Sequence, residues 1–108
     1  MSRYMVQVSY TKEAAAALVN KPEDRAVAVR PLIEAMGGRL LDFYFCFGDY
    51  DVVLIVELPN NAAAMATDLA ALVPGHVSKI KTTVLLSPEE GVAAMWKAAG
   101  FTLRAPGA

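Results

Sequence analysis

Two apolar runs on either side of a glycine turn constrain the fold of this chain more than any other feature. Residues 40–47 read LLDFYFCF and residues 51–58 read DVVLIVEL, with Gly48, Asp49 and Tyr50 between them. Both runs are rich in β-branched and aromatic residues, which is typical of strands. Glycine at the first turn position adopts a positive φ without steric cost, so this turn predicts a two-residue type II′ hairpin at Gly48-Asp49.

The hairpin fixes which residues of the two strands face each other. One predicted face is apolar and packs under helices, with the pairs Phe47 with Tyr50, Phe45 with Val52, Phe43 with Leu54, and Leu41 with Val56. The opposite face is mixed, with the pairs Cys46 with Asp51, Tyr44 with Val53, Asp42 with Ile55, and Leu40 with Glu57. Because Val53 and Ile55 make the second strand apolar on both sides, neither face is a plain solvent surface.

The remaining elements follow from periodicity and capping. We expect strands at 4–10 and 77–86, and helices at 12–19, 20–36, 62–73 and 87–99. The capping box expected for the second helix pairs Asn20 with Glu23, and the one for the last helix pairs Ser87 with Glu90. Pro31 lies inside the second helix and is expected to kink it. Gly37-Gly38 is expected to end it.

The resulting order is β-α-β-β-α-β followed by an extra helix. This order is typical of the ferredoxin-like α+β fold, an antiparallel sheet with helices on one face. Helices on one face leave the other sheet face bare, so we expect a second copy of the sheet to cover it, in a homodimer or a higher homo-oligomer. A single domain over residues 1–99 and a flexible tail over 100–108 are predicted.

Composition excludes several classes of function. The chain has 108 residues, 56% of them hydrophobic and 19% charged, which indicates one globular domain. Its net charge is −1 and its basic residues are scattered, so we expect no nucleic-acid partner. No apolar run reaches the roughly 20 residues of a membrane span, and the start of the chain does not resemble a signal peptide. The single cysteine, Cys46, fits a reducing cytoplasm.

The sequence resembles the GYD domain family, small and mostly bacterial proteins with a Gly-x-Tyr-Asp signature. The matching segments are YFCFGDYD (44–51) with Gly48, Tyr50 and Asp51 as the signature, KTTVLL (81–86), the acidic helix start after it, Ser9-Tyr10-Thr11 and Gly37-Gly38. The resemblance covers residues 3 to 95. It implies a ferredoxin-like fold of the dimeric α/β-barrel kind and no established activity. Pro31 departs from the plain helix expected of the family.

Three residues are weak catalytic candidates: Asp51, His76 and Tyr50. Asp51 could act as a base or acceptor at a cavity mouth, but an aspartate beside a turn more often accepts backbone N–H bonds. His76, the only histidine, would need a carboxylate partner such as Asp51 or Glu57, and is otherwise a solvated loop residue. The residues that could line a ligand pocket are Tyr44, Tyr50, Asp51, Gln7 and Ser9.

Other chemistry has little support in the sequence. One cysteine and one histidine do not make a structural zinc site, and no cofactor motif is present. A lone histidine can ligate haem, which stays open as a minor alternative. Cys46 is expected to face Asp51, and a neighbouring carboxylate disfavours the reactive thiolate.

Three functions remain possible on the sequence alone. The first is a homo-oligomeric module that binds a small apolar or aromatic ligand. The second is a cofactor-independent oxygenase or isomerase of the dimeric α/β-barrel type, supported by fold analogy only. The third is a protein whose bare sheet face serves assembly alone. The absence of a conventional catalytic set favours the binding module, and whether the chain is an enzyme is left open.

Overall fold

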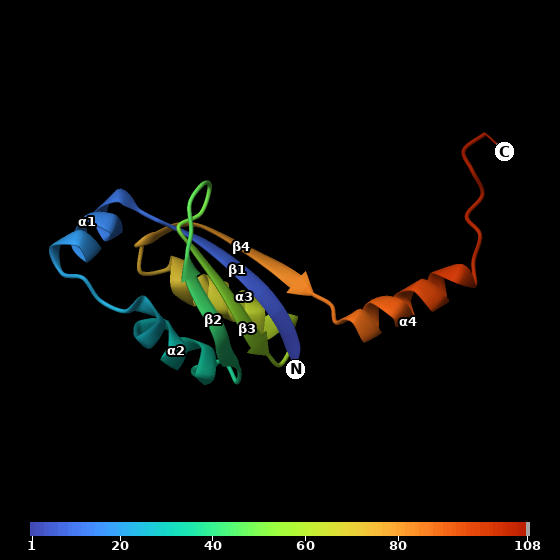
Figure 1. Ribbon diagram of the computed structural model, residues 1–108, viewed down its shortest axis with the longest axis horizontal. Helices are drawn as coiled ribbons and strands as arrows, with labels where there is room; N and C mark the ends of the chain where they lie inside the picture. Colours follow the sequence, from blue (N-terminus) through green and yellow to red (C-terminus); the bar gives the residue numbers. More distant parts are fainter. Residues whose placement is uncertain (108) are drawn as a thin grey trace.

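The computed structural model describes residues 1–107 and has the predicted order of strands and helices (Figure 1). The elements are β1 (Ser2–Tyr10), α1 (Lys12–Asn20), α2 (Arg25–Ala35), β2 (Arg39–Phe45), β3 (Val52–Leu58), α3 (Asn61–Leu72), β4 (Val77–Leu85) and α4 (Pro88–Ala99). No helix within residues 1–107 has the length and apolar character needed to cross a bilayer.

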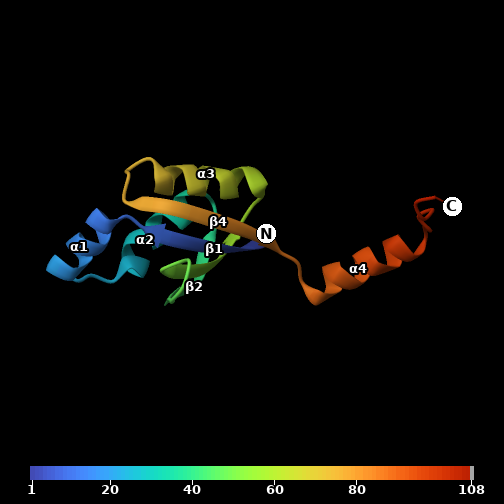
Figure 2. The same cartoon turned by 90° about the horizontal axis from the view of Figure 1, so that it is seen from above.

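The four strands form one antiparallel sheet in the order β2-β3-β1-β4. Figure 2 shows α3 lying along one face of this sheet, and α2 packs on the same face. The predicted ferredoxin-like fold is therefore confirmed. β4 is an edge strand, and its exposed Lys79 and Lys81 are the charged side chains that protect such an edge from pairing.

The core lies between the sheet and the α2/α3 layer. Its buried residues alternate along β1 and β3 and are completed by one residue each from α2, β2 and α3: Tyr4, Val6, Val8, Val52, Leu54, Val56, Leu58, Ile33, Leu40 and Ala64. This alternation is the pattern of a sheet that packs on one face. The Tyr4 hydroxyl, at the edge of this core, donates to Asn61 Oδ1 at 2.7 Å, so its burial leaves no unpaired polar group.

The β2–β3 hairpin keeps the predicted register, but its loop is longer than two residues. Phe45 pairs with Val52, and the last bond across the hairpin runs from the Cys46 N–H to the Asp51 carbonyl at 2.9 Å. Gly48 has the predicted positive φ, at 99°. The predicted pairing of Phe47 with Tyr50 is wrong, because the strand pattern ends before them and Phe47 is fully exposed. Phe45 is also 66% exposed, which corrects its assignment to the core.

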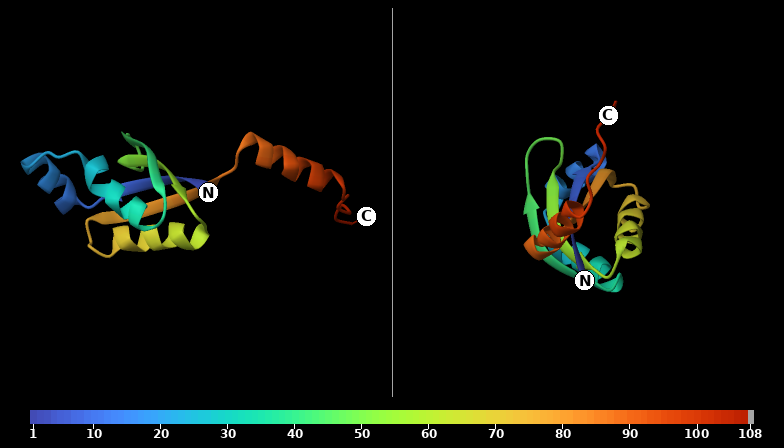
Figure 3. Two further views of the ribbon diagram at one scale, coloured as in Figure 1. Left: turned by 90° about the horizontal axis from the view of Figure 1, so that it is seen from below. Right: turned by 90° about the vertical axis from the view of Figure 1, so that its right-hand side faces the viewer.

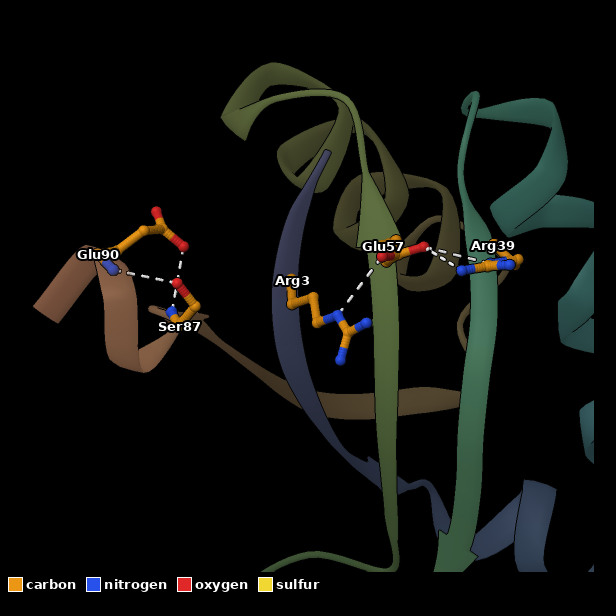
Figure 4. Close-up of polar contacts among 5 residues, drawn as sticks. All are labelled: Arg3, Arg39, Glu57, Ser87 and Glu90. Atoms are coloured by element: carbon orange, nitrogen blue, oxygen red, sulfur yellow. Dashed lines mark hydrogen bonds and ion pairs between the residues drawn. The ribbon is translucent and has the colours of Figure 1, made fainter.

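A bulge at Leu41 corrects the other end of the predicted hairpin. The pairing shifts between Leu40 and Asp42, so Leu40 lies opposite Val56 and Arg39 lies opposite Glu57. The shift turns Leu40 into the core, where it is buried. A bulge of this kind interrupts the alternation of side chains, so that even-numbered and odd-numbered residues of one strand can lie on the same face. The shifted pairing also places Arg39 opposite Glu57, which accepts from it at 2.7 Å. Glu57 accepts from Arg3 of β1 as well, at 3.4 Å (Figure 4).

The second helix begins later in the sequence than predicted. α1 ends at Asn20, and Asp24 caps α2 by accepting from the Ala26 N–H at 2.9 Å. The capping box predicted at Asn20 and Glu23 is therefore wrong, because Asp24 caps the second helix instead. α2 continues through Pro31 to Ala35.

α4 extends away from the rest of the domain (Figures 1 and 2). Its capping box is formed as predicted, with Ser87 and Glu90 each accepting the other's backbone N–H at 3.1 Å (Figure 4). Residues 100–107 form no helix or strand, and Ala108, the end of the predicted tail, lies outside the described residues.

We predict that Gly38→Ala destabilises the fold by about 3 kcal/mol, because a Cβ here overlaps the Glu57 carbonyl oxygen and the Leu58 side chain. Urea denaturation measures the free energy of unfolding. The control is Gly91→Ala on α4, where a Cβ meets open space and helix propensity improves. Equal stability of the Gly38 variant and the wild type would contradict the close approach.

Candidate binding cavity

An apolar cavity of about 230 Å³ lies between the sheet and the α2/α3 layer. Its walls come from all four strands and from both helices. The sheet contributes Val6, Val8, Phe43, Val52, Leu54, Val56, Val77 and Ile80, and the helices contribute Ala28, Val29, Leu32, Ile33, Thr67, Ala70 and Ala71. The cavity therefore occupies part of the space that a fully packed core would fill.

The interior of the cavity offers no free polar group to a ligand. Thr67 is the only polar residue among the walls given above, and its hydroxyl donates to the Ala63 carbonyl at 2.9 Å within α3. A buried hydroxyl that is already paired gains nothing from a polar ligand atom. The interior is therefore suited to an apolar group.

The lining also includes three polar side chains, Tyr10, Arg25 and His76, and we call the end of the cavity where they lie its mouth. These residues come from the end of β1, the start of α2 and the loop before β4. The same three side chains border a second hollow of about 200 Å³ beneath α1, so they separate the two spaces. Arg25 also forms an ion pair with Glu23 at 2.7 Å, which holds its guanidinium at this position.

Partial burial and mutual contacts shift the pKa values of Tyr10 and Arg25 at the mouth. Burial raises the pKa of the Tyr10 hydroxyl, and the nearby Arg25 only partly opposes this shift. Burial alone would lower the pKa of Arg25, but its contacts with Glu23 and Tyr10 outweigh this effect and raise it. At neutral pH the mouth therefore presents a neutral hydroxyl that can donate a hydrogen bond, beside a permanent positive charge.

Asp51 and Ser9, two of the predicted site residues, hold the hairpin loop onto β1. Asp51 Oδ2 accepts from the Tyr10 N–H at 2.9 Å, and the Asp51 N–H donates to the Val8 carbonyl at 2.8 Å. The Ser9 hydroxyl donates to the Asp49 carbonyl at 2.8 Å. Asp51 thus accepts a backbone N–H, as a turn-flanking aspartate does, and it lies next to the cavity mouth rather than in the cavity.

Gln7, Tyr50 and Tyr44 belong to the opposite face of the sheet. Gln7 and Tyr50 border a shallow hollow there, together with Lys81, and Lys79 Nζ lies 4.6 Å from the centroid of the Tyr50 ring. Tyr44 is 61% exposed on the same face. Gln7, Ser9 and Tyr44 thus share the bare face by strand alternation, and none of the five predicted ligand-binding residues lines the apolar cavity.

His76 lies at the cavity mouth, as one of the three residues that form it. Its backbone carbonyl accepts from the Thr11 N–H at 3.0 Å, which fixes the loop. Within residues 1–107 its imidazole has no hydrogen bond to a carboxylate, and Glu57 lies at the other end of the sheet with its two arginines. His76 thus forms no hydrogen bond with Asp51 or Glu57, the carboxylate partners that a catalytic role would need.

Cys46, the single cysteine of the sequence, lies in the hairpin loop directly after β2. The Cys46 thiol contacts the Tyr50 carbonyl oxygen at 3.2 Å inside the hairpin loop. In the described part of the chain, no group of three or more His, Cys, Asp or Glu side chains is placed to hold a metal ion.

Sequence reasoning missed Arg25 and the role of Tyr10. The available signal was Asp24, an alternative helix cap that would have placed Arg25 at a helix start beside the end of β1. It also missed Asp68 on α3, whose carboxylate accepts from the Thr82 hydroxyl of β4 at 2.7 Å. Burial raises the pKa of the Asp68 carboxyl, and the bond from Thr82 opposes the shift.

We predict that Asp68→Asn stabilises the protein at pH 7, by less than about 1 kcal/mol because Asp68 is partly solvated. The asparagine side chain keeps an acceptor for Thr82 and removes the buried charge. Because the folded-state pKa of Asp68 is raised, the wild-type carboxyl contributes its full stability below the unfolded pKa, near 4, and loses it as pH rises through the folded pKa.

The difference in unfolding free energy between variant and wild type should therefore shrink as pH falls from 7 to 4. Chemical denaturation at the two pH values measures it. A difference that is the same at both values would contradict the assignment, and Asp42→Asn, exposed on the opposite face, is the control.

Two solved structures resemble this fold at low sequence identity. MtbAldR matches with a TM-score of 0.54 and 17% identity over 80% of this chain, which spans 52% of that protein. TTHA0845 from Thermus thermophilus matches with a TM-score of 0.52 and 16% identity, over 81% of this chain and 95% of the other. No curated protein matches the sequence. The GYD domain model matches residues 4–95, so this chain belongs to the GYD domain family.

Proposed function

We propose that this GYD-domain protein binds a small, mainly apolar ligand in the cavity between its sheet and the α2/α3 layer. The observation that supports this proposal is the cavity itself, which is apolar inside and polar only at its mouth. Ligand sites of soluble proteins have this character, with a few polar groups that orient the ligand.

The volume of the cavity limits the size of the ligand. At about 230 Å³ it exceeds the roughly 150 Å³ of an apolar cavity known to admit benzene. It is smaller than the roughly 300 Å³ at which sites for drug-sized molecules begin. A substituted single aromatic ring or a short branched acyl group fits this range.

The mouth favours a ligand with one acceptor oxygen. The Tyr10 hydroxyl is protonated at neutral pH, since burial raises further a pKa that is ordinarily near 10, and it can donate a hydrogen bond to a carbonyl. Arg25 adds positive charge on the same side. An aromatic ketone, aldehyde or ester with its oxygen at the mouth satisfies both parts of the site.

The proposal includes a homodimer through the face of the sheet that the helices leave bare. On this face Met5, Val53 and Ile55 are only partly covered within one chain. Apolar side chains on two facing sheets pack together at a spacing of about 10 Å.

A second candidate function is a cofactor-independent oxygenase or isomerase, which the titratable Tyr10 and His76 at the mouth favour.

We predict that Ala71→Leu lowers affinity for acetophenone at least tenfold, the factor produced by about 1.4 kcal/mol. Ala71 lines the cavity from α3, so a larger side chain occupies the ligand's space. Ala62→Leu, exposed on the same helix, is the matched control and should bind like the wild type. Calorimetric titration measures both, and equal affinity of the two variants would contradict the location of the site.

Tyr10→Phe should remove the preference for an acceptor oxygen. We expect the ratio of affinities for acetophenone and isopropylbenzene, which have similar shapes, to fall about fivefold, since a neutral hydrogen bond contributes about 1 kcal/mol. The comparison uses chemical-shift titrations of both compounds against both proteins. A ratio that does not change would show that Tyr10 does not contact the ligand.

A further inference from the structure

α4 carries an apolar face that nothing in its own chain covers. Val92, Met95, Trp96 and Ala99 follow the spacing of one helix face, and none of the residues of α4 is buried. Trp96 is 77% exposed, and Phe101 and Leu103 after the helix are exposed as well. We call α4 together with residues 100–107 the arm.

The arm is built as a helix that needs a partner. A helix of this length is marginal in water by itself, because most helical stability in proteins comes from packing an amphipathic face. Ser87, Pro88 and Glu90 nevertheless specify its start strongly. Stable helix formation here therefore requires a surface that takes up Met95 and Trp96.

The surface area of the chain is that of a protein with an uncovered interface. The accessible surface is 7611 Å², against about 5,800 Å² for a compact folded chain of 11.5 kDa. The excess of about 1,800 Å² is larger than the roughly 800 Å² that each partner buries in an interface of standard size. The radius of gyration of 17.8 Å, against about 13 Å for a compact domain, agrees with this.

A second uncovered apolar group lies at the opposite end of the sheet. Phe45 and Phe47 at the β2–β3 hairpin are 66% and fully exposed. The hairpin loop adjoins the end of β1 and the start of β4, whereas the arm follows the end of β4. The nine residues of β4 separate the two groups by about 30 Å at 3.3 Å per residue. Since α4 also extends outward, the arm cannot reach the hairpin of its own chain (Figure 1).

A twofold axis that lies between two stacked sheets and perpendicular to their strands places opposite ends of the sheets together. In that arrangement the arm of one copy lies beside the hairpin of its partner. Viewed along the long axis of the molecule, α4 crosses in front of the β2 and β3 side of the sheet, which is the side of the hairpin (Figure 3).

Charge agrees with this orientation of the two sheets. The first turn of α4 carries Glu89 and Glu90. Lys79 and Lys81 lie toward the start of β4, on the bare face and exposed. The same axis brings the acidic turn of one copy toward the lysines of the other, and opposite charges across an interface fix its register.

We propose that a second copy of this chain covers the exposed hairpin aromatic with its arm, so that Trp96 of each copy packs on Phe47 of the other. The inference rests on the sheet-face dimer proposed above. Phe47 is the hairpin aromatic that such a dimer presents to the arm, because it borders the hollow on the bare face together with Gln7 and Lys81.

Trp96 is the only tryptophan, so its fluorescence reports on the arm alone. We expect wild-type emission to shift to longer wavelength on dilution, in step with dissociation measured by sedimentation. Phe47→Ser should cause the same shift at fixed concentration and raise the dimer Kd at least about tenfold, as loss of a central interface aromatic does. Val19→Glu, an exposed site on α1, is the control and should change neither quantity.

A mixing experiment shows which chain provides the hairpin. The Trp96→Phe chain is free of tryptophan and keeps an intact hairpin, and the Phe47→Ser chain keeps Trp96. After the two are mixed, the emission should return toward shorter wavelength as mixed dimers form. Emission that does not change on mixing, although sedimentation shows exchange, would overturn the arm inference.

The possible failures are distinguishable from one another. A dimer whose Kd and emission are insensitive to Phe47→Ser overturns the arm inference and leaves the sheet-face dimer standing. A chain that stays monomeric at all accessible concentrations overturns both. Neither result bears on acetophenone binding to the cavity, which the Ala71→Leu variant tests separately. Far-ultraviolet circular dichroism of each variant excludes unfolding as the cause of a change.

Discussion

The mismatch in side-chain size between α3 and the sheet determines the rest of this structure. α3 reads NAAAMATDLAAL and presents Ala70 and Ala71 to a sheet of valines and leucines. Ridges of long side chains set the distance between a helix and a sheet, and an alanine does not fill the space that this distance leaves. Ile33 and Val56 are consequently almost fully buried, while open apolar volume remains beside Ala70 and Ala71. An open apolar volume inside an otherwise packed domain is the feature on which the proposed function depends.

The loop end of the sheet connects that volume to solvent and to the hairpin. Asp51 binds the Tyr10 N–H, so the GYD signature segment fixes the end of β1 from which Tyr10 reaches the cavity mouth. In the proposed site the signature therefore acts through backbone position, since Asp51 does not line the cavity itself. Phe43 and Phe45 join the cavity to the outer surface of the hairpin on the same end of the molecule.

The topology and most of the register were predictable because they depend on local patterns. Gly48 and the alternation of β3 determine the pairing of Phe43 and Phe45 with their partners. The bulge at Leu41 was not predictable, since Leu40 and Leu41 are equally apolar and only the packed core selects between them. The break before α2 depended on a choice between Asn20 and Asp24 as cap, which local sequence does not decide.

Most of the candidate site could not be predicted from the sequence. A cavity depends on the distance between layers, and no pattern of residues encodes the space that Ala71 leaves empty. Tyr10, Arg25 and His76 are far apart in the chain and meet only because α1 and α2 are separate helices. His76 was identified as a candidate because it is the only histidine, whereas Arg25 had no comparable signal.

The measurement that tests the central claim most directly is a crystal structure of the protein under xenon pressure. Xenon enters empty apolar cavities and scatters strongly, so it marks accessible volume without specific chemistry. We predict that xenon, or a ligand retained from the cell, lies between Ala71 and Val52, next to Tyr10. A cavity closed by Leu32 and Phe43, with xenon found only elsewhere, would contradict it.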